Sequence, residues 1–288
     1  MNNTFNIKRF GLVFRKDLIE NGRRYLLLFL TMFGLITVLI TYQTWGYYEY
    51  KMSTQILDDS VVSSHSNGFI FGHLSVLFFV FGIWFASTFS NPINSKLKRL
   101  SFFINPSSNL EKYLSRWLLT TVGFILAFFV ALAFADILMV AICSVRFPDA
   151  DIQFIDFNKF VAPSEQENYR EFFIMRKIVF TLLIGFYFLI QSIFLLGSTI
   201  WEKASFIKTF TAGVVIVAVF SLLCRWTLLL LYGNPSNFEN VINSFEWDET
   251  TSPDKALSFV IAVFAVFTLT NWILAYFRLK ESEIIKRL

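Results

Sequence analysis

The side chains that could perform chemistry in this 288-residue chain are few and scattered. Its two histidines, His65 and His73, lie eight positions apart, and no third ligand near them completes a zinc site. The sequence has no phosphate-binding G-x-x-x-x-G-K loop, no H-E-x-x-H pair and no G-x-S-x-G nucleophile elbow. It therefore predicts no catalytic residue, no metal site and no cofactor bound by this chain.

Two ionisable residues, Asp136 and Arg225, lie well inside apolar segments. An unpaired charge at that depth costs about 2.5–3.5 kcal/mol on insertion scales. Counted from Trp117 and Thr209, they lie about 28 and 24 Å along their helices, so an ion pair between them is one hypothesis. The alternative is that Arg225 marks the outer end of its helix and extends its side chain toward water.

The most structured polar signal is INPSSNLEKYLSRW, residues 104–117. Ser108 and Glu111 fit the capping box S-x-x-E, in which each residue binds a backbone N–H at the start of a helix. Pro106 ends whatever precedes it. A helix should therefore begin near Asn109, in water, and continue without a break into the apolar segment that follows.

The loop before this helix start is basic and partly apolar. Asn94 or Ser95 can cap a short helix, SKLKRLSFF, that presents basic residues beside aromatic ones. Residues 91–116 thus have two interpretations, a well-capped connecting loop or a docking site for a partner. The candidate contact residues of the second interpretation are Lys98, Arg99, Phe102, Phe103, Glu111, Lys112 and Arg116.

Composition indicates where these elements lie. The chain is 55% hydrophobic and 16% charged, whereas soluble domains are about 45–50% apolar and about 25% charged. The excess is concentrated in runs of about 20 residues, the length a helix needs to cross a bilayer. The sequence predicts an all-α polytopic membrane protein with six transmembrane helices, at about 25–44, 69–89, 117–145, 178–200, 209–232 and 257–277.

The charge distribution predicts the orientation. With a cytoplasmic N-terminus, 17 of the 25 basic residues but six of the 21 acidic ones fall on the inner side, which puts both termini in the cytoplasm. The net charge of +4 is thereby assigned to inner loops and not to nucleic-acid binding. Residues 1–24 form a basic amphipathic helix, ended by Asn21-Gly22, that should lie along the inner membrane surface. Residues 25–277 form the membrane domain, and residues 278–288 a cytoplasmic tail.

Three stretches resemble the permease subunits of type-2 ABC exporters. They are the PSSNLEKYLSRW run, the inner turn STIWEKASFIKTF at 198–210, and the tail AYFRLKESEIIKRL at 275–288. The six spans and the amphipathic N-terminal helix agree with that family in layout. The match lacks the substrate-contact residues of the polysaccharide- and sterol-type relatives.

The resemblance implies a transport subunit and not an enzyme. A homodimer, or a heterodimer with a sibling chain, would span a bacterial cytoplasmic (inner) membrane. Separate ATP-binding-cassette ATPase subunits, carrying ATP and Mg, would dock on the 91–116 loop. The resemblance also implies a helical re-entrant turn at 232–247. The alternatives are a non-transporting scaffold or immunity protein, or a secondary transporter, which would need charged midplane sites.

Overall fold

The computed structural model describes residues 5–54, 59–91, 106–148, 150, 152, 154–155, 170–201, 203–232 and 253–285. The fold is all-α, as the sequence predicts. Its elements are α1 (Ile7–Thr54), α2 (Asp59–Ser87), α4 (Asn109–Leu118), the π-helical turn η2 (Leu119–Gly123), α5 (Phe124–Arg146), α7 (Arg170–Ile200), α8 (Ser205–Tyr232) and α10 (Pro253–Ile285).

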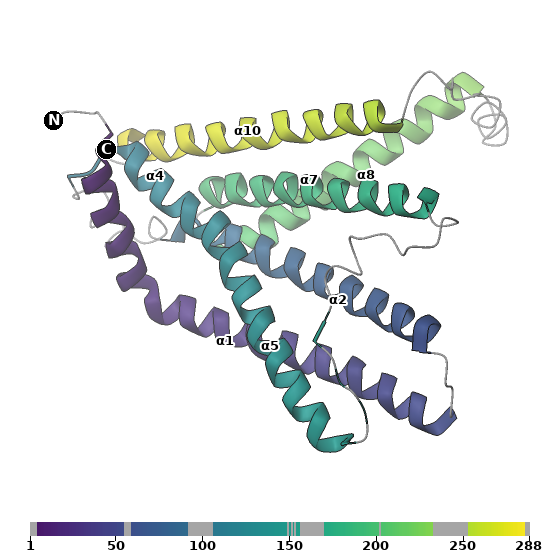
Figure 1. The fold of residues 1–288 in the computed structure, drawn as a ribbon. Coiled ribbons are helices and arrows are strands. Elements are labelled where there is room, and N and C mark those ends of the chain that lie inside the picture. Colours follow the sequence, from purple (N-terminus) through teal and green to yellow (C-terminus); the bar gives the residue numbers. More distant parts are fainter. Residues whose placement is uncertain are drawn as a thin grey trace.

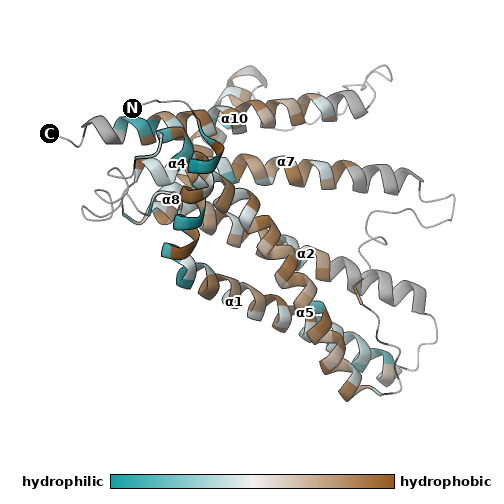
Figure 2. Ribbon diagram, turned by 60° about the vertical axis from the view of Figure 1, so that its left-hand side comes forward, coloured by the Kyte–Doolittle hydropathy of each residue, from teal (hydrophilic) through white to brown (hydrophobic). Residues whose placement is uncertain are grey.

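Six of the described helical units are long and apolar enough to cross a bilayer, with α4, η2 and α5 counted as one. They coincide with the six segments expected from the sequence, except that the second ends at Ser87 and not at residue 89. The chain is therefore a multi-pass membrane protein. Figure 2 shows hydrophobic residues along the long helices and a concentration of hydrophilic ones near the chain termini and α4.

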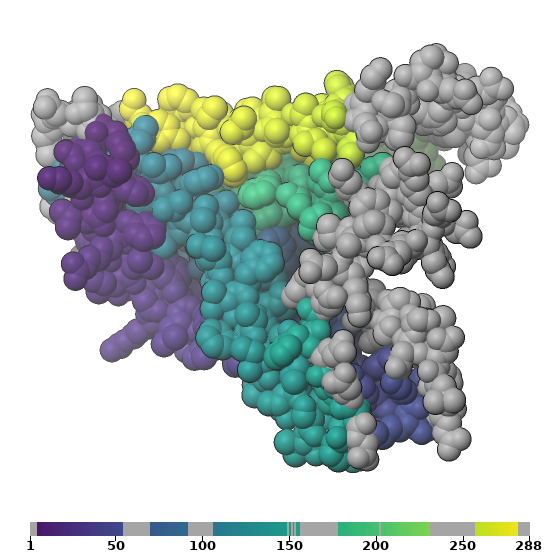
Figure 3. All heavy atoms as spheres, in the orientation of Figure 1, coloured from purple at the N-terminus to yellow at the C-terminus, as the bar shows by residue number. Residues whose placement is uncertain are grey.

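The helices diverge from one end of the molecule (Figure 1). α5 packs along α1, α10 packs along α7, and α2 packs against α7. Both termini and α4 lie at the narrow end, where the space-filling view shows the start of α1 beside α4 and α10 (Figure 3). We call this the basal end; it comprises the start of α1, the end of α2, α4, the turn between α7 and α8, and the C-terminal part of α10.

The core has two parts. The larger one lies among α1, α2, α5 and α7, and the smaller one joins α2, α4, α7 and α10 near the basal end. Close packing in the larger part depends on Gly82, because a Cβ there would lie 2.6 Å from the ring of Tyr187. A small residue at such a crossing lets two membrane helices approach closely.

The first helix differs from the prediction. α1 continues through Asn21-Gly22, so the expected boundary at residue 24 falls inside one helix, which changes direction in its N-terminal half (Figure 1). The Asn21 side chain donates to the Asp17 carbonyl oxygen at 3.1 Å, inside the helix. Keeping Asn21 and Gly22 helical costs about 1–2 kcal/mol in helix propensity. Ending the helix there would leave backbone N–H and C=O groups without partners near lipid, at several kcal/mol each, so the helix continues.

The inward face of the N-terminal segment also differs. An amphipathic helix on the membrane surface would direct its apolar side chains into lipid and its charges into water, but here Asp17 is buried with Val13, while Ile7 and Leu18 are exposed. The segment therefore packs against α4 through a polar face in addition to offering apolar residues outward.

The third helical unit begins where the capping box predicts and runs to Arg146. The π-helical turn η2 inside it is a feature that the sequence analysis did not anticipate. The short helix expected at 95–103 and most of the re-entrant turn expected at 232–247 lie outside the described residues.

Candidate functional site

The first turn of α4 is built by the capping box. Ser108 Oγ accepts from the Glu111 backbone N–H at 3.3 Å, and Glu111 Oε2 accepts from the Ser108 N–H at 3.0 Å. This confirms the predicted start of the helix. The cap satisfies two of the backbone donors that every helix start leaves without an internal partner.

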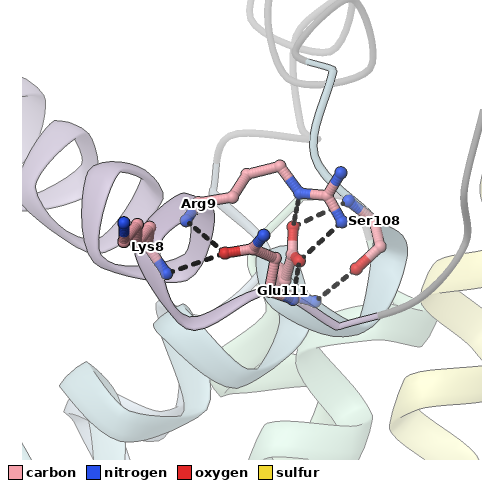
Figure 4. Close-up of polar contacts among 5 residues, drawn as sticks. Lys8, Arg9, Ser108 and Glu111 are labelled. Carbon is pink, nitrogen blue, oxygen red and sulfur yellow. Dashed lines mark hydrogen bonds and ion pairs between the residues drawn. The ribbon is translucent and has the colours of Figure 1, made fainter.

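The Glu111 carboxylate has a second role that joins two helices (Figure 4). Arg9 of α1 donates to it twice, from Nε to Oε2 at 2.7 Å and from Nη2 to Oε1 at 2.8 Å. The Asn6 backbone N–H donates to Oε1 at 2.8 Å, while the Asn6 side chain accepts from the N–H groups of Lys8 and Arg9 at the start of α1. One carboxylate thus lies at two helix N-termini, where the helix dipoles favour negative charge.

The environment of Glu111 keeps it ionised. Its side chain is 0% exposed, whereas that of Arg9 is 32% exposed. The Arg9 hydrogen bonds, assisted by the Asn6 and Ser108 N–H groups, outweigh the effect of burial and lower the pKa of Glu111 from 4.5 to about 2. A fork of two parallel N–H···O bonds to a carboxylate also fixes orientation. The pair therefore sets the position of α1 against α4.

A second connection lies two turns further along α1. Asp17 Oδ2 accepts from Ser115 Oγ at 3.0 Å, and Asp17 Oδ1 accepts from Arg116 Nη2 at 3.4 Å. Arg116 Nη1 donates to the Phe89 carbonyl oxygen at 2.7 Å, just after α2 ends. All three side chains are buried. This network joins α1, α4 and the end of α2.

The opposite side of α4 contacts α10. Tyr113 donates its hydroxyl to the Trp272 carbonyl oxygen at 2.8 Å, and its ring lies 5.4 Å from Phe89 and 5.5 Å from Tyr276. Trp117 packs edge-on against Trp272, with ring centroids 5.0 Å apart. α4 is thus held by α1, α10 and the segment that follows α2.

The turn between α7 and α8 completes the basal end. Ser205 Oγ donates to the Ser87 carbonyl oxygen at 2.9 Å, and Ser90 Oγ donates to the Ser198 carbonyl oxygen. Ala204 has a φ of 53°, which reverses the chain tightly at a modest strain cost. The end of α2 is therefore bound to this turn as well as to α4.

The predicted contact residues fall into two groups. Glu111, Lys112 and Arg116 are brought together on α4, but their side chains are buried and face this chain's own helices. Lys98, Arg99, Phe102 and Phe103 lie outside the described residues. The expectation that an ATPase contacts these seven side chains stays a prediction, and the burial of the three on α4 favours an indirect role for them.

The structure does not bring Asp136 and Arg225 together. Asp136 accepts from the Ile155 backbone N–H at 3.2 Å, and the Arg225 side chain is exposed. The reason is the helix arrangement: α8 packs chiefly on α7 and does not run along α5. The predicted ion pair is therefore absent between these two described residues, and a loop N–H takes its place at Asp136.

Sequence reasoning missed Arg9, Asp17 and Asn6 as members of this site. Arg9 and Glu111 are separated by 102 positions, and no local pattern links them. One signal was available: Asp17 lies on a basic amphipathic helix that the sequence assigned wholly to the membrane surface. A buried carboxylate needs a partner, and Arg116 fits that need.

The arrangement is suited to holding helices in register. Within the described residues, no three His, Cys, Asp or Glu side chains lie close enough to hold a metal ion. No protein-family model, no curated protein and no solved structure matches this chain.

Proposed function

We propose that this chain is the permease subunit of an ATP-driven exporter of the type-2 ABC class. In this proposal the basal end faces the cytoplasm of a bacterium and the chain pairs with a second copy or a sibling. A separate ATPase, which holds ATP and Mg, docks on residues 91–108. The proposal combines the sequence resemblance with the geometry of the basal end.

The observation that carries the proposal is the position of α4. The loop proposed to bind the ATPase leads directly into α4, and α4 is joined to α1 by Glu111 and Asp17, and to α10 by Tyr113. Arg116 adds the segment after α2. A displacement of the loop would therefore reach three transmembrane helices through hydrogen bonds and packed side chains.

Exposed basic side chains support the proposed orientation. Lys8, Arg15, Lys203, Lys208 and Lys280 are exposed at or near the basal end. Excess Lys and Arg in short segments beside transmembrane helices marks the cytoplasmic side. The same positive surface would neighbour an ATPase docked beneath the loop.

The packing of α8 supports a second subunit. Among the α8 residues whose side chains the structure describes, Thr209 alone is buried. A helix packed mainly against one neighbour leaves most of its circumference for lipid or for another chain. A two-fold pair through α8 would give Arg225 a protein environment in place of lipid.

The test is co-purification of the full-length chain from its native membrane in detergent, with identification of any bound ATP-binding-cassette ATPase. Reversing the loop charges with Lys98→Glu and Arg99→Glu should remove the ATPase. Arg146→Glu, the same change at the opposite end, should leave it bound. Glu111→Gln should retain the ATPase but change its ATP hydrolysis rate in the complex.

The outcomes separate the proposal from its alternatives. Absence of an ATPase from the wild-type preparation overturns the exporter proposal and favours a scaffold or a secondary transporter. An ATPase that stays bound after the Lys98 and Arg99 reversal would place the docking surface elsewhere.

A further inference from the structure

An apolar cavity of about 410 Å³ lies between α1, α2 and the η2–α5 unit. Phe29 and Met32 line it from α1, Phe81 from α2, and Phe124 from α5. Tyr25 is the one lining residue with a polar side-chain group. Volumes of this size are typical of small-molecule sites, and the lining suits a hydrocarbon.

The cavity is long and open on one side. Its α1 wall includes Leu18, Gly22, Tyr25, Phe29 and Met32, spaced three or four residues apart along one helix face. From the first to the last of these the helix rises about 21 Å, which exceeds one leaflet of a bilayer with a hydrocarbon core of about 30 Å. Leu18 is exposed and Met32 is buried, so the cavity deepens away from the basal end.

The charges near its shallow end are positive. Arg15 precedes Leu18 by three residues on the same helix face, whereas Arg23 and Arg24 follow Gly22 on the two faces of α1 that flank the lining. All three arginines are exposed, and none forms an ion pair with another described residue. Lys16, by contrast, is paired with Glu20 at 3.6 Å.

We propose that this cavity binds one anionic phospholipid of the surrounding leaflet. One acyl chain lies between α1, α2 and α5, and the phosphate headgroup lies beside Arg15 at the shallow end, with Arg23 and Arg24 adding positive charge from the flanking faces of α1. The apolar lining selects the chain, and the positive charge of the three arginines, none of them ion-paired with a described residue, selects the negative headgroup. The proposal depends on the chain being a membrane protein and not on its partnership with an ATPase.

Gly22 offers a direct test. A Cβ added at Gly22 meets no atom within 4 Å, so Gly22→Phe can enter the cavity without displacing backbone. Gly34 is a matched control, because it lies on the same helix, has the same open space and does not line the cavity. Ala127→Phe fills the cavity from the α5 wall and serves as a second variant.

The experiment titrates purified full-length protein in detergent with phosphatidylglycerol, or with phosphatidylcholine of the same acyl chains, and measures bound lipid by native mass spectrometry. Wild type and Gly34→Phe should bind one phosphatidylglycerol. In Gly22→Phe and Ala127→Phe, binding should weaken about tenfold or more, because a phenyl ring replaces several methylene groups. The triple change of Arg15, Arg23 and Arg24 to Gln should remove most of the preference for phosphatidylglycerol.

Two results would overturn the proposal. One is unchanged phosphatidylglycerol binding in either filled variant, provided that its circular dichroism spectrum and elution volume match those of the wild type. The other is a filled variant that changes the oligomeric state while lipid binding stays constant, which would assign the cavity to a second copy of the chain. Equal affinity of the wild type for both lipids would remove the headgroup part of the proposal.

Discussion

The Arg9–Glu111 pair is the contact that most directly joins α1 to α4, and its removal gives the sharpest prediction. The perturbation is a double-mutant cycle of Arg9→Met, Glu111→Gln and both together. Gln at position 111 keeps an acceptor for the Ser108 N–H, since capping boxes accept Glu or Gln. The change therefore removes the charge and the ion pair while preserving the helix start.

The magnitude follows from the site geometry. A pKa lowered from 4.5 to about 2 corresponds to about 3 kcal/mol of preference for the charged form in the folded protein. The Asn6 and Ser108 N–H groups supply part of this, and solvent screens the partly exposed Arg9. We expect each single change to lower the free energy of unfolding by about 2–3 kcal/mol, and the double change by about 3 kcal/mol.

The assay is reversible unfolding of the purified protein in mixed micelles by increasing dodecyl sulfate, followed by near-ultraviolet circular dichroism. The expected coupling energy, the sum of the two single losses minus the loss of the double change, is about 1–3 kcal/mol. Losses that add within about 0.5 kcal/mol would refute the reasoning, because they would mean that Arg9 and Glu111 do not interact. Arg225→Met is the matched control, as this exposed arginine contacts neither residue, and it should leave stability unchanged.

The same pair predicts a pH dependence. The pKa of Glu111 is depressed in the folded state, so the unfolded chain binds more protons at acid pH. The stabilisation is fully present above pH 4.5 and is lost as the pH falls toward about 2. The stability difference between wild type and Glu111→Gln should be constant from pH 7 to pH 6 and should shrink below pH 4.5. A difference as large at pH 3 as at pH 7 would contradict the assignment.

Two further predictions concern the α7–α8 region. Gly197→Ala should lower the free energy of unfolding by about 1–3 kcal/mol, because its Cβ would lie 2.9 Å from the Thr209 Cβ. Gly213→Ala, whose Cβ meets no atom within 4 Å, should be neutral or slightly stabilising. Equal effects of the two changes in a thermal unfolding assay would contradict the close approach of α7 and α8. If α8 lies at a two-fold interface, oxidation of native membranes should join two chains by a disulfide through exposed Cys224 and not through buried Cys143. The measurement is the disulfide-linked dimer on a non-reducing gel. A Cys224→Ser chain that still forms this dimer would contradict the α8 interface.

The sequence was informative wherever structure depends on local pattern or on length. Six apolar runs predicted six membrane helices because a helix pairs its own backbone N–H and C=O groups within one segment, as lipid requires. The capping box predicted a helix start near Asn109, where α4 begins, because its two hydrogen bonds join positions three apart. Neither inference needs knowledge of what the rest of the chain contacts.

The remaining features depend on which helices become neighbours. The Arg9–Glu111 and Asp17–Arg116 contacts join residues about 100 positions apart, and many basic residues could have served as partners. Of the two hypotheses for Asp136 and Arg225, the ion pair is not formed between these described residues, since equal depth in the membrane does not imply adjacent helices. The continuation of α1 through Asn21-Gly22 shows that the low helix propensity of these two residues does not end a helix whose flanking segments are both helical.

Burial of the α4 charges alters how coupling to an ATPase would operate. Glu111 and Arg116 already have partners inside the chain, so an ATPase would bind the loop before α4, and its displacement would enter the helix at Ser108. Because Glu111 both caps α4 and binds Arg9, the first turn of α4 cannot unwind without releasing α1. We therefore expect α4 and the start of α1 to move as one body, and the compensating rearrangement to occur at η2. There the π-helical turn alters the regular hydrogen-bond ladder, and Thr121 accepts from Gln191 of α7 at 2.9 Å.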